Sequence, residues 1–202
     1  DESDPIYITD AEFQSILGLA WLDQFYKRVF YFYRETGCRL REPFISSLDG
    51  NWLDIPNLSK GKKPRSIELD KSLVQIYMEL MEWHNNCGLV EGSKGRHISK
   101  MFKKTLRSIG ADETKHFHSL RHTFAVRRIV ENVPIYKIQK MMGHSSVATT
   151  EVYLKLELKR LKQDFPTINT DYYKPVKSEF RDTEIRDTIK NQYAFIESEM
   201  TN

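Results

Sequence analysis

The chain has 202 residues, of which 40% are hydrophobic and 12% aromatic, enough for one hydrophobic core but little more. No apolar run approaches the roughly 20 residues that cross a bilayer, which predicts no membrane partner. The start, residues 1–5, is acidic and unlike a signal peptide, so we expect a cytoplasmic protein. Because the first residue is Asp1 and not Met, we also expect a fragment of a longer protein.

Charge is distributed unevenly along the chain. Residues 36–163 carry 23 basic and 13 acidic side chains, a net charge of +10, whereas residues 1–35 and 164–202 have net charges of −4 and −3. A contiguous positive block suits a polyanion such as nucleic acid, because each neutralised phosphate releases condensed counterions. Lysines and arginines that only solvate helix surfaces would give the same count, so charge alone leaves both interpretations open.

The two cysteines, Cys38 and Cys87, could form at most one bridge and lack CxxC spacing. A disulfide framework or a cysteine-based zinc site is therefore not expected. We predict that both thiols are reduced.

The first half of the chain predicts two helices and a small sheet. Thr9 stands three residues before Glu12, the pattern of a capped helix start, and this helix should run to about residue 19. An aromatic-rich second helix covers residues 21–36. Apolar and polar residues alternate in two later segments and indicate antiparallel strands joined by a basic connector. The strands are residues 52–55 and 66–69, and the connector is residues 60–65.

Helical periodicity dominates the rest of the chain. It predicts helices over residues 71–86, 97–109, 119–131, 135–142 and 147–162. Apolar residues at helical spacing indicate one more helix over 176–199, after the connector 166–175. The predicted fold class is α+β, mainly α-helical, with a small antiparallel sheet.

Two motifs carry most of the chemistry. In HSLRHTFA, His118 and Arg121 are three residues apart near a helix start, so they share a face and can hold one phosphate together. In MGHSS, Gly143 permits a sharp turn that exposes His144 between two helices. Tyr153 follows nine residues later, and its phenol, with an ordinary pKa near ~10, needs a cation or base nearby to act as a nucleophile.

Two further residues complete the set of candidates, and every candidate also has an ordinary interpretation. Arg39 lies in TGCRLRE, and Lys60 lies in the basic connector. Singly, such residues are more often ion-paired arginines, turn lysines, helix-capping histidines or buried tyrosines with satisfied hydroxyls.

In this order and spacing, the motifs resemble the catalytic domain of the tyrosine recombinase, or phage integrase, family. The resemblance covers roughly residues 6–160, and HSLRHTFA followed by GHSS and EVY is its most specific part. It implies a catalytic domain over residues 1–165 and a C-terminal tail over 166–202. The tail helix could dock on a neighbouring protomer or fold back on its own domain. The N-terminal DNA-binding clamp that is usual in the family is not expected in this chain.

The resemblance also assigns roles. Arg39, Arg121 and His118 would hold the non-bridging oxygens of a scissile phosphate, which stabilises the developing charge. Tyr153 would attack the phosphorus, giving a 3′-phosphotyrosine and a free 5′-hydroxyl, so that no cofactor or metal is needed. Lys60 would protonate the departing oxygen, and His144 would hydrogen-bond the phosphate or help position the nucleophile. The implied catalytic residues are Arg39, Lys60, His118, Arg121, His144 and the nucleophile Tyr153.

Some positions stay open. Lys62 and Lys63 could replace Lys60 as the general acid. The resemblance favours Lys60, because it precedes the glycine where members of the family commonly place their lysine. Arg39 is preferred to Arg41, and Pro43 departs from the family pattern, which usually continues a helix there.

The implied function is site-specific recombination of double-stranded DNA through a Holliday junction by a homotetramer, for integration or excision of a mobile element or virus. Such a protein would associate with the nucleoid or with host-cell DNA. A type IB topoisomerase, a telomere-resolving enzyme and a non-catalytic DNA-binding relative are the alternatives. A metal hydrolase or zinc module is a further class, but no HExxH glutamate is present and a neighbouring arginine would repel a cation. Its ligands would be His116, His118, His122 and His144.

Overall fold

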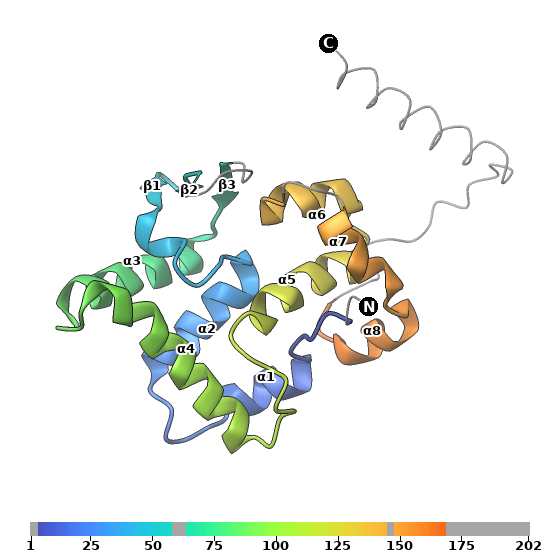
Figure 1. Ribbon diagram of the computed structural model, residues 1–202, viewed down its shortest axis with the longest axis horizontal. Helices are drawn as coiled ribbons and strands as arrows, with labels where there is room; N and C mark the ends of the chain where they lie inside the picture. The colour runs from blue at the N-terminus through green and yellow to red at the C-terminus, as the bar shows by residue number, and fades with distance from the viewer. Residues whose placement is uncertain (1–3, 58–63, 145–147, 169–202) are drawn as a thin grey trace, which may run out of the picture. The chain divides into compact units, whose positions relative to one another are not determined.

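The computed structural model describes residues 4–57, 64–144 and 148–168. The chain divides into two units, residues 1–169 and 170–202, and every described residue belongs to the first (Figure 1). The helix predicted over 176–199 lies outside the described residues.

The first two helices form much as predicted. Helix α1 spans Asp10–Leu17, two residues shorter than expected, and α2 spans Gln24–Thr36. Thr9 and Glu12 cap α1 reciprocally: Glu12 N donates to Thr9 Oγ1 at 3.2 Å, and Thr9 N donates to Glu12 Oε2 at 2.9 Å. Asp23 caps the start of α2 by accepting a hydrogen bond from the backbone of Phe25.

The sheet has one strand more than predicted. After the short 3-10 helix η1 (Pro43–Ile45), three antiparallel strands follow in the order β1-β2-β3. They are β1 (Ser47–Asp49), β2 (Trp52–Ile55) and β3 (Arg65–Glu68). The prediction missed β1 because a three-residue strand is too short to show alternation. Pairing with β2, which sets Leu48 opposite Leu53, defines it instead.

Four helices come next in the chain after the sheet. They are α3 (Lys71–Asn86), α4 (Glu91–Ser108), α5 (Ser119–Val130) and α6 (Ile135–Met142). Helix α4 begins six residues before its predicted start, because Gly92 and Gly95 have poor helix propensity and hid the first turns. A Cβ at Gly95 would lie 3.3 Å from Leu40 Cγ, so close packing accounts for this glycine. None of the described helices is long and apolar enough to cross a membrane.

The single helix predicted over 147–162 is wrong. The described part of this segment contains α7 (Ala148–Glu151), the 3-10 helix η2 (Val152–Lys155) and α8 (Leu158–Asp164). Leu156 is extended and separates η2 from α8. Tertiary contacts explain the break, because Thr150 and Tyr153 are buried and bind side chains outside this segment.

Two hydrophobic clusters meet along α5. The first gathers apolar residues of α1, α2, α3, α4 and the sheet, and the second gathers those of α5, α6, η2 and α8. Leu120 belongs to the first cluster and Phe124 to the second, so Arg121 lies in sequence between them. In Figure 1, α5 runs through the middle of the described unit, between α2 and the pair α6 and α8.

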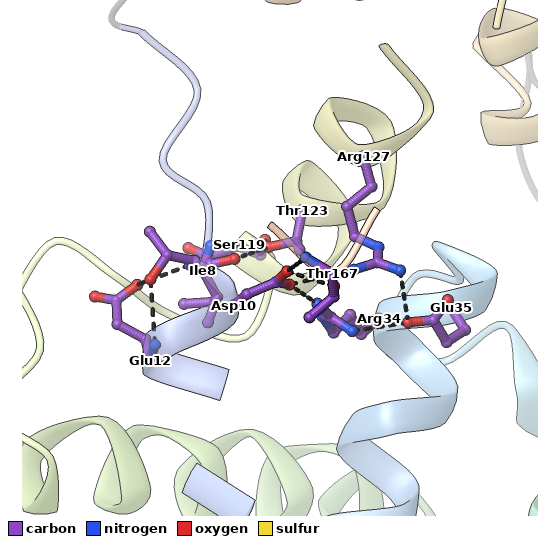
Figure 2. Close-up of polar contacts among 10 residues, drawn as sticks. Ile8, Asp10, Glu12, Arg34, Glu35, Ser119, Thr123, Arg127 and Thr167 are labelled. Carbon is purple, nitrogen blue, oxygen red and sulfur yellow. Dashed lines mark hydrogen bonds and ion pairs between the residues drawn. The ribbon is translucent and has the colours of Figure 1, made fainter. Parts of the chain in front are cut away.

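A buried ionic cluster holds α1, α2 and α5 to the residues after α8. Asp10 is 3% exposed, and its Oδ1 accepts hydrogen bonds from Arg34 Nη2 and, at 3.3 Å, from Arg127 Nη1. Its Oδ2 accepts from the backbone N of Thr167 at 3.0 Å and from the Thr167 hydroxyl (Figure 2). Glu35 forms an ion pair with each of the two arginines. We call these five residues the Asp10 cluster.

Candidate active site

Arg121 links the parts of the candidate site. The side chain extends from the first turn of α5 and is 2% exposed. Its Nη1 donates to the carbonyl of Gly37 at 2.6 Å, and its Nη2 donates to the carbonyl of Met142. Arg121 therefore holds together the turn that precedes Arg39 and the end of α6 that precedes His144.

Two glycines allow these segments to approach. Gly37 and Gly143 end α2 and α6 with φ values of 63° and 61°, in the left-handed region that favours glycine. A Cβ at Gly37 would lie 2.6 Å from Phe124 Cδ1, and one at Gly143 would lie 2.9 Å from Arg65 Nη1. Both glycines are therefore favoured by backbone conformation, and at Gly37 the aromatic ring also leaves no room for a Cβ.

Glu42 is buried between two arginines. Arg39 donates to it from Nη1 at 2.7 Å and from its backbone N at 2.6 Å. Arg65, on β3, donates from Nη1 at 3.0 Å and from Nη2 at 2.7 Å. Burial would raise the pKa of Glu42, but the hydrogen bonds and charge of Arg65, together with Arg39, lower the pKa to about 2. Glu42 is therefore ionised at neutral pH and orients both guanidinium groups.

Positive charge exceeds negative charge around Glu42. Burial and the charges of Arg39 and Arg65 lower the pKa of Arg121 to about 9, so its guanidinium is still protonated at neutral pH. The positive charges of three arginines thus repel one another, and one carboxylate offsets them only in part. We call Arg39, Glu42, Arg65 and Arg121 the Glu42 cluster. An unbalanced cluster of forked donors is suited to an anion such as a phosphate.

Two predicted histidines border this cluster. His144 Nδ1 lies 2.9 Å from Thr150 Oγ1, and burial with the charges of Arg121 and Arg39 lowers the pKa of His144 to about 3. His118 stands at the N-terminus of α5 and is more exposed. Partial desolvation and the charge of Arg121 also lower the pKa of His118. Both imidazoles are therefore neutral at pH 7.

Tyr153 lies next to the charged groups. It is 2% exposed, and its hydroxyl is 2.8 Å from Nδ1 of His122, the residue after Arg121. Burial raises the pKa of Tyr153 to about 12, although the charge of Arg121 acts in the opposite direction. The phenol keeps its proton at neutral pH in the free protein.

Five of the six predicted site residues are thus brought together from distant parts of the chain. They are Arg39, His118, Arg121, His144 and Tyr153. The sixth, Lys60, and its alternatives Lys62 and Lys63 lie outside the described residues. Arg39 and not Arg41 contacts Glu42, and Arg41 is exposed. Pro43 begins η1, where its missing N–H is tolerated.

Sequence reasoning missed three residues of the site. Glu42 follows Arg39 by three residues, a spacing at which the two side chains can pair, and Arg65 ends the basic connector. For His122, the sequence by itself suggests only the role of a possible zinc ligand. No local signal pairs Glu42 with Arg65 or His122 with Tyr153, since these partners are 23 and 31 residues apart.

The histidines considered as metal ligands have other contacts. His122 and His144 contact Tyr153 and Thr150, and His116 Nδ1 lies 2.9 Å from the carbonyl of Thr114. In the part of the chain that the structure describes, no three His, Cys, Asp or Glu side chains are grouped so that they could hold a metal ion.

Solved structures define the class of fold. The crystal structure of XerA recombinase matches with a TM-score of 0.62 and 22% identity, covering 81% of this chain and 66% of that one. The Tn1549 transposon integrase in complex with transposon right end DNA also matches with a TM-score of 0.62, at 16% identity and the same coverages. The fold is that of a tyrosine recombinase catalytic domain.

The family is shown by sequence. The profile described as the phage integrase family matches residues 27–160, and the chain belongs to this family. Tyrosine recombinase XerC of Chromohalobacter salexigens is 29% identical over 160 residues, covering 71% of this chain and 51% of the relative. XerC of Corynebacterium efficiens is 31% identical over 145 residues, covering 64% and 46%. The chain spans about half the length of the curated relatives that it matches.

Proposed function

We propose that the protein is a site-specific DNA recombinase that cuts and rejoins DNA strands through a 3′-phosphotyrosine at Tyr153. The observation that carries the proposal is the position of a buried tyrosine beside the Glu42 cluster, which holds three arginines and one carboxylate. This arrangement offers a phosphodiester both a nucleophile and a set of donors for its charge. Membership of the phage integrase family supports the same reading.

Arg39, Arg121 and His118 bind the non-bridging oxygens of the scissile phosphate. Glu42 holds Arg39 at 2.7 Å, so this guanidinium reaches the phosphate in a fixed orientation. As the phosphorus becomes five-coordinate, negative charge builds up on these oxygens and the preorganised donors stabilise it. His144 donates a hydrogen bond to the same phosphate.

Tyr153 attacks the phosphorus, and the bond to the 5′-oxygen breaks. Lys60 donates a proton to the departing oxygen. The phosphotyrosine retains the energy of the broken bond, so a different 5′-hydroxyl can reverse the reaction and join a new strand without a cofactor.

The substrate is double-stranded DNA at specific sites, and the active assembly is a tetramer that exchanges four strands through a Holliday junction. Residues 1–165 form the catalytic domain, and residues 166–202 form a tail. Structural relatives include recombinases solved with DNA, such as XerH bound to its difH substrate. Another relative is a lambda integrase dimer bound to a COC′ core site. Integration or excision of a mobile element or virus is the biological role that we infer.

The test is covalent trapping. The protein is incubated in excess chelator with a library of randomised duplexes, each nicked just beyond a candidate scissile phosphate so that cleavage releases a short strand and cannot reverse. We expect a protein–DNA adduct that resists denaturation, and sequencing of the trapped DNA gives the preferred site. The Tyr153→Phe variant is the control, because it lacks only the nucleophilic oxygen.

Loss of the adduct in Tyr153→Phe establishes metal-free tyrosine catalysis. Binding of DNA by the wild type without any adduct contradicts strand exchange and leaves a DNA-binding role. An adduct that persists in Tyr153→Phe refutes the assignment of the nucleophile.

A further inference from the structure

The proposed reaction leaves one proton without a destination. When the Tyr153 hydroxyl attacks phosphorus, its proton must go to a base, and none of the predicted site residues was assigned that task. His122 lies within reach, because its Nδ1 is 2.8 Å from the Tyr153 hydroxyl oxygen. Both groups stand on defined elements, His122 on α5 and Tyr153 on η2, and their ring centroids are 5.8 Å apart.

We propose that His122 accepts the phenolic proton of Tyr153 during strand cleavage, an inference that rests on the proposed function. The Tyr153 oxygen forms a bond to phosphorus, and its proton passes to Nδ1 of His122. The phosphorus–oxygen bond to the 5′ side breaks, and the departing oxygen takes a separate proton from the general acid. In the rejoining step His122 returns its proton to Tyr153 as the phosphotyrosine bond breaks.

His122 is in the correct state to act as a base. Burial and the neighbouring His118, His116 and Arg121 lower the pKa of His122 to about 4, so its ring is neutral at pH 7 and can accept a proton. Among the residues that the structure describes, these three and Tyr153 are the titratable or charged groups that face it. The ring of His118 is also in edge contact with that of His122, at 4.9 Å between centroids.

The transfer is coupled to attack. The pKa of Tyr153 is raised to about 12, which keeps the proton on the phenol while no substrate is present. Bond formation to phosphorus makes the phenolic oxygen more acidic, and an anionic phosphate nearby makes an imidazole more basic. The proton therefore moves in the transition state, where general-base catalysis is effective.

His122 provides the one hydrogen bond that the Tyr153 hydroxyl makes with a described residue. His144 has Thr150 as its partner, and Arg121 is protonated at neutral pH.

The experiment separates proton transfer from positioning. His122→Asn keeps an acceptor atom near the place of Nδ1 but cannot take up a proton at neutral pH, whereas His122→Ala removes both functions. Single-turnover cleavage is measured on the nicked duplex recovered with wild-type protein, and on the same duplex with sulfur in place of the 5′-bridging oxygen. A thiolate leaves without a general acid. Lys60→Ala, which removes the proposed general acid, is therefore the comparison for protonation of the leaving group. Thermal unfolding checks that each variant is folded.

We expect His122→Asn and His122→Ala to cleave at least about 10²-fold more slowly than wild type near pH 7. The slower cleavage by both His122 variants persists on the duplex with sulfur at the 5′-bridging position. The slower cleavage by Lys60→Ala becomes less marked on that duplex. Raising the pH narrows the deficit of His122→Asn, because hydroxide replaces the missing base.

Cleavage by His122→Asn within about threefold of wild type overturns the proposal. In that case a defect confined to His122→Ala shows that His122 only positions the phenol. Failure of the wild type itself to form an adduct is a different result, because it refutes the proposed function as a whole.

Discussion

The Asp10 cluster and the Glu42 cluster are both buried ionic groups built on a carboxylate between two arginines, yet their charges balance differently. In the Asp10 cluster, two arginines meet two carboxylates, and Thr167 supplies the remaining donors to Asp10. In the Glu42 cluster, Arg39 and Arg65 pair with a single carboxylate, and the charge of Arg121 lies near it without a second carboxylate.

This difference predicts a structural role for the Asp10 cluster and anion binding for the Glu42 cluster. A balanced ionic group needs no further partner and holds elements together, whereas an unbalanced one is stabilised when an anion arrives. Helix α5 carries Arg127 in the Asp10 cluster and Arg121 in the Glu42 cluster, so one helix contributes to both. Variants of paired residues in the two clusters test the distinction.

The largest expected effect is on catalysis, from Arg121→Lys. A lysine ammonium cannot donate to the carbonyls of Gly37 and Met142 and also present a fork to a phosphate. We expect single-turnover cleavage of the trapped duplex to fall by about 10²–10³-fold. The matched control is Arg127→Lys on the same helix, which should cleave like wild type. Equal losses in both variants would contradict the comparison.

The next effect is on stability, from Asp10→Asn and Glu42→Gln. Each change removes the charge of a buried carboxylate and leaves arginines without a counter-ion, so we expect the free energy of unfolding to fall by about 3 kcal/mol. Urea denaturation measures this loss. The two variants should differ in activity, because only Glu42 orients Arg39. Folded Asp10→Asn should cleave normally and Glu42→Gln slowly, and the reverse order would refute the assignment.

A smaller effect comes from pH. Protein burial lowers the pKa of His122 to about 4 and that of His144 to about 3, below the ordinary 6.5. The unfolded chain therefore binds more protons, so stability is complete above about pH 6.5 and decreases as the pH falls toward these values. We expect urea midpoints to be lower at pH 5.5 than at pH 7.5. His122→Asn should show a shallower decrease, and a midpoint independent of pH in the wild type would contradict the prediction.

The smallest effect is expected from Thr167→Val. The substitution removes the hydroxyl donor to Asp10 but keeps the backbone donor, so stability should fall by only about 1 kcal/mol. Thr167→Ser, which retains the hydroxyl, should be close to wild type. Cleavage by folded Thr167→Val should not change, and a tenfold loss would connect the Asp10 cluster to the active site.

Much of the fold could be predicted because its signals are local. The capping box of Thr9 and Glu12 and the periodicity of α3 and α6 gave correct starts or complete spans. The error over 147–162 has the opposite origin, since contacts of Thr150 and Tyr153 with histidines outside this segment override local helix propensity there. The start of α4 was missed because its glycines serve packing against another segment.

The sequence by itself determined the family and the candidates for the catalytic residues. Their types and spacing form a specific pattern that can be recognised without knowing which residues are in contact. Only the tertiary structure decided how these residues are paired and charged. Arg65 meets Glu42 across 23 residues and His122 meets Tyr153 across 31, contacts that depend on the packing of β3, α5 and η2. Burial then lowers the pKa of His122 and raises that of Tyr153, because desolvation depends on surroundings that no local pattern records.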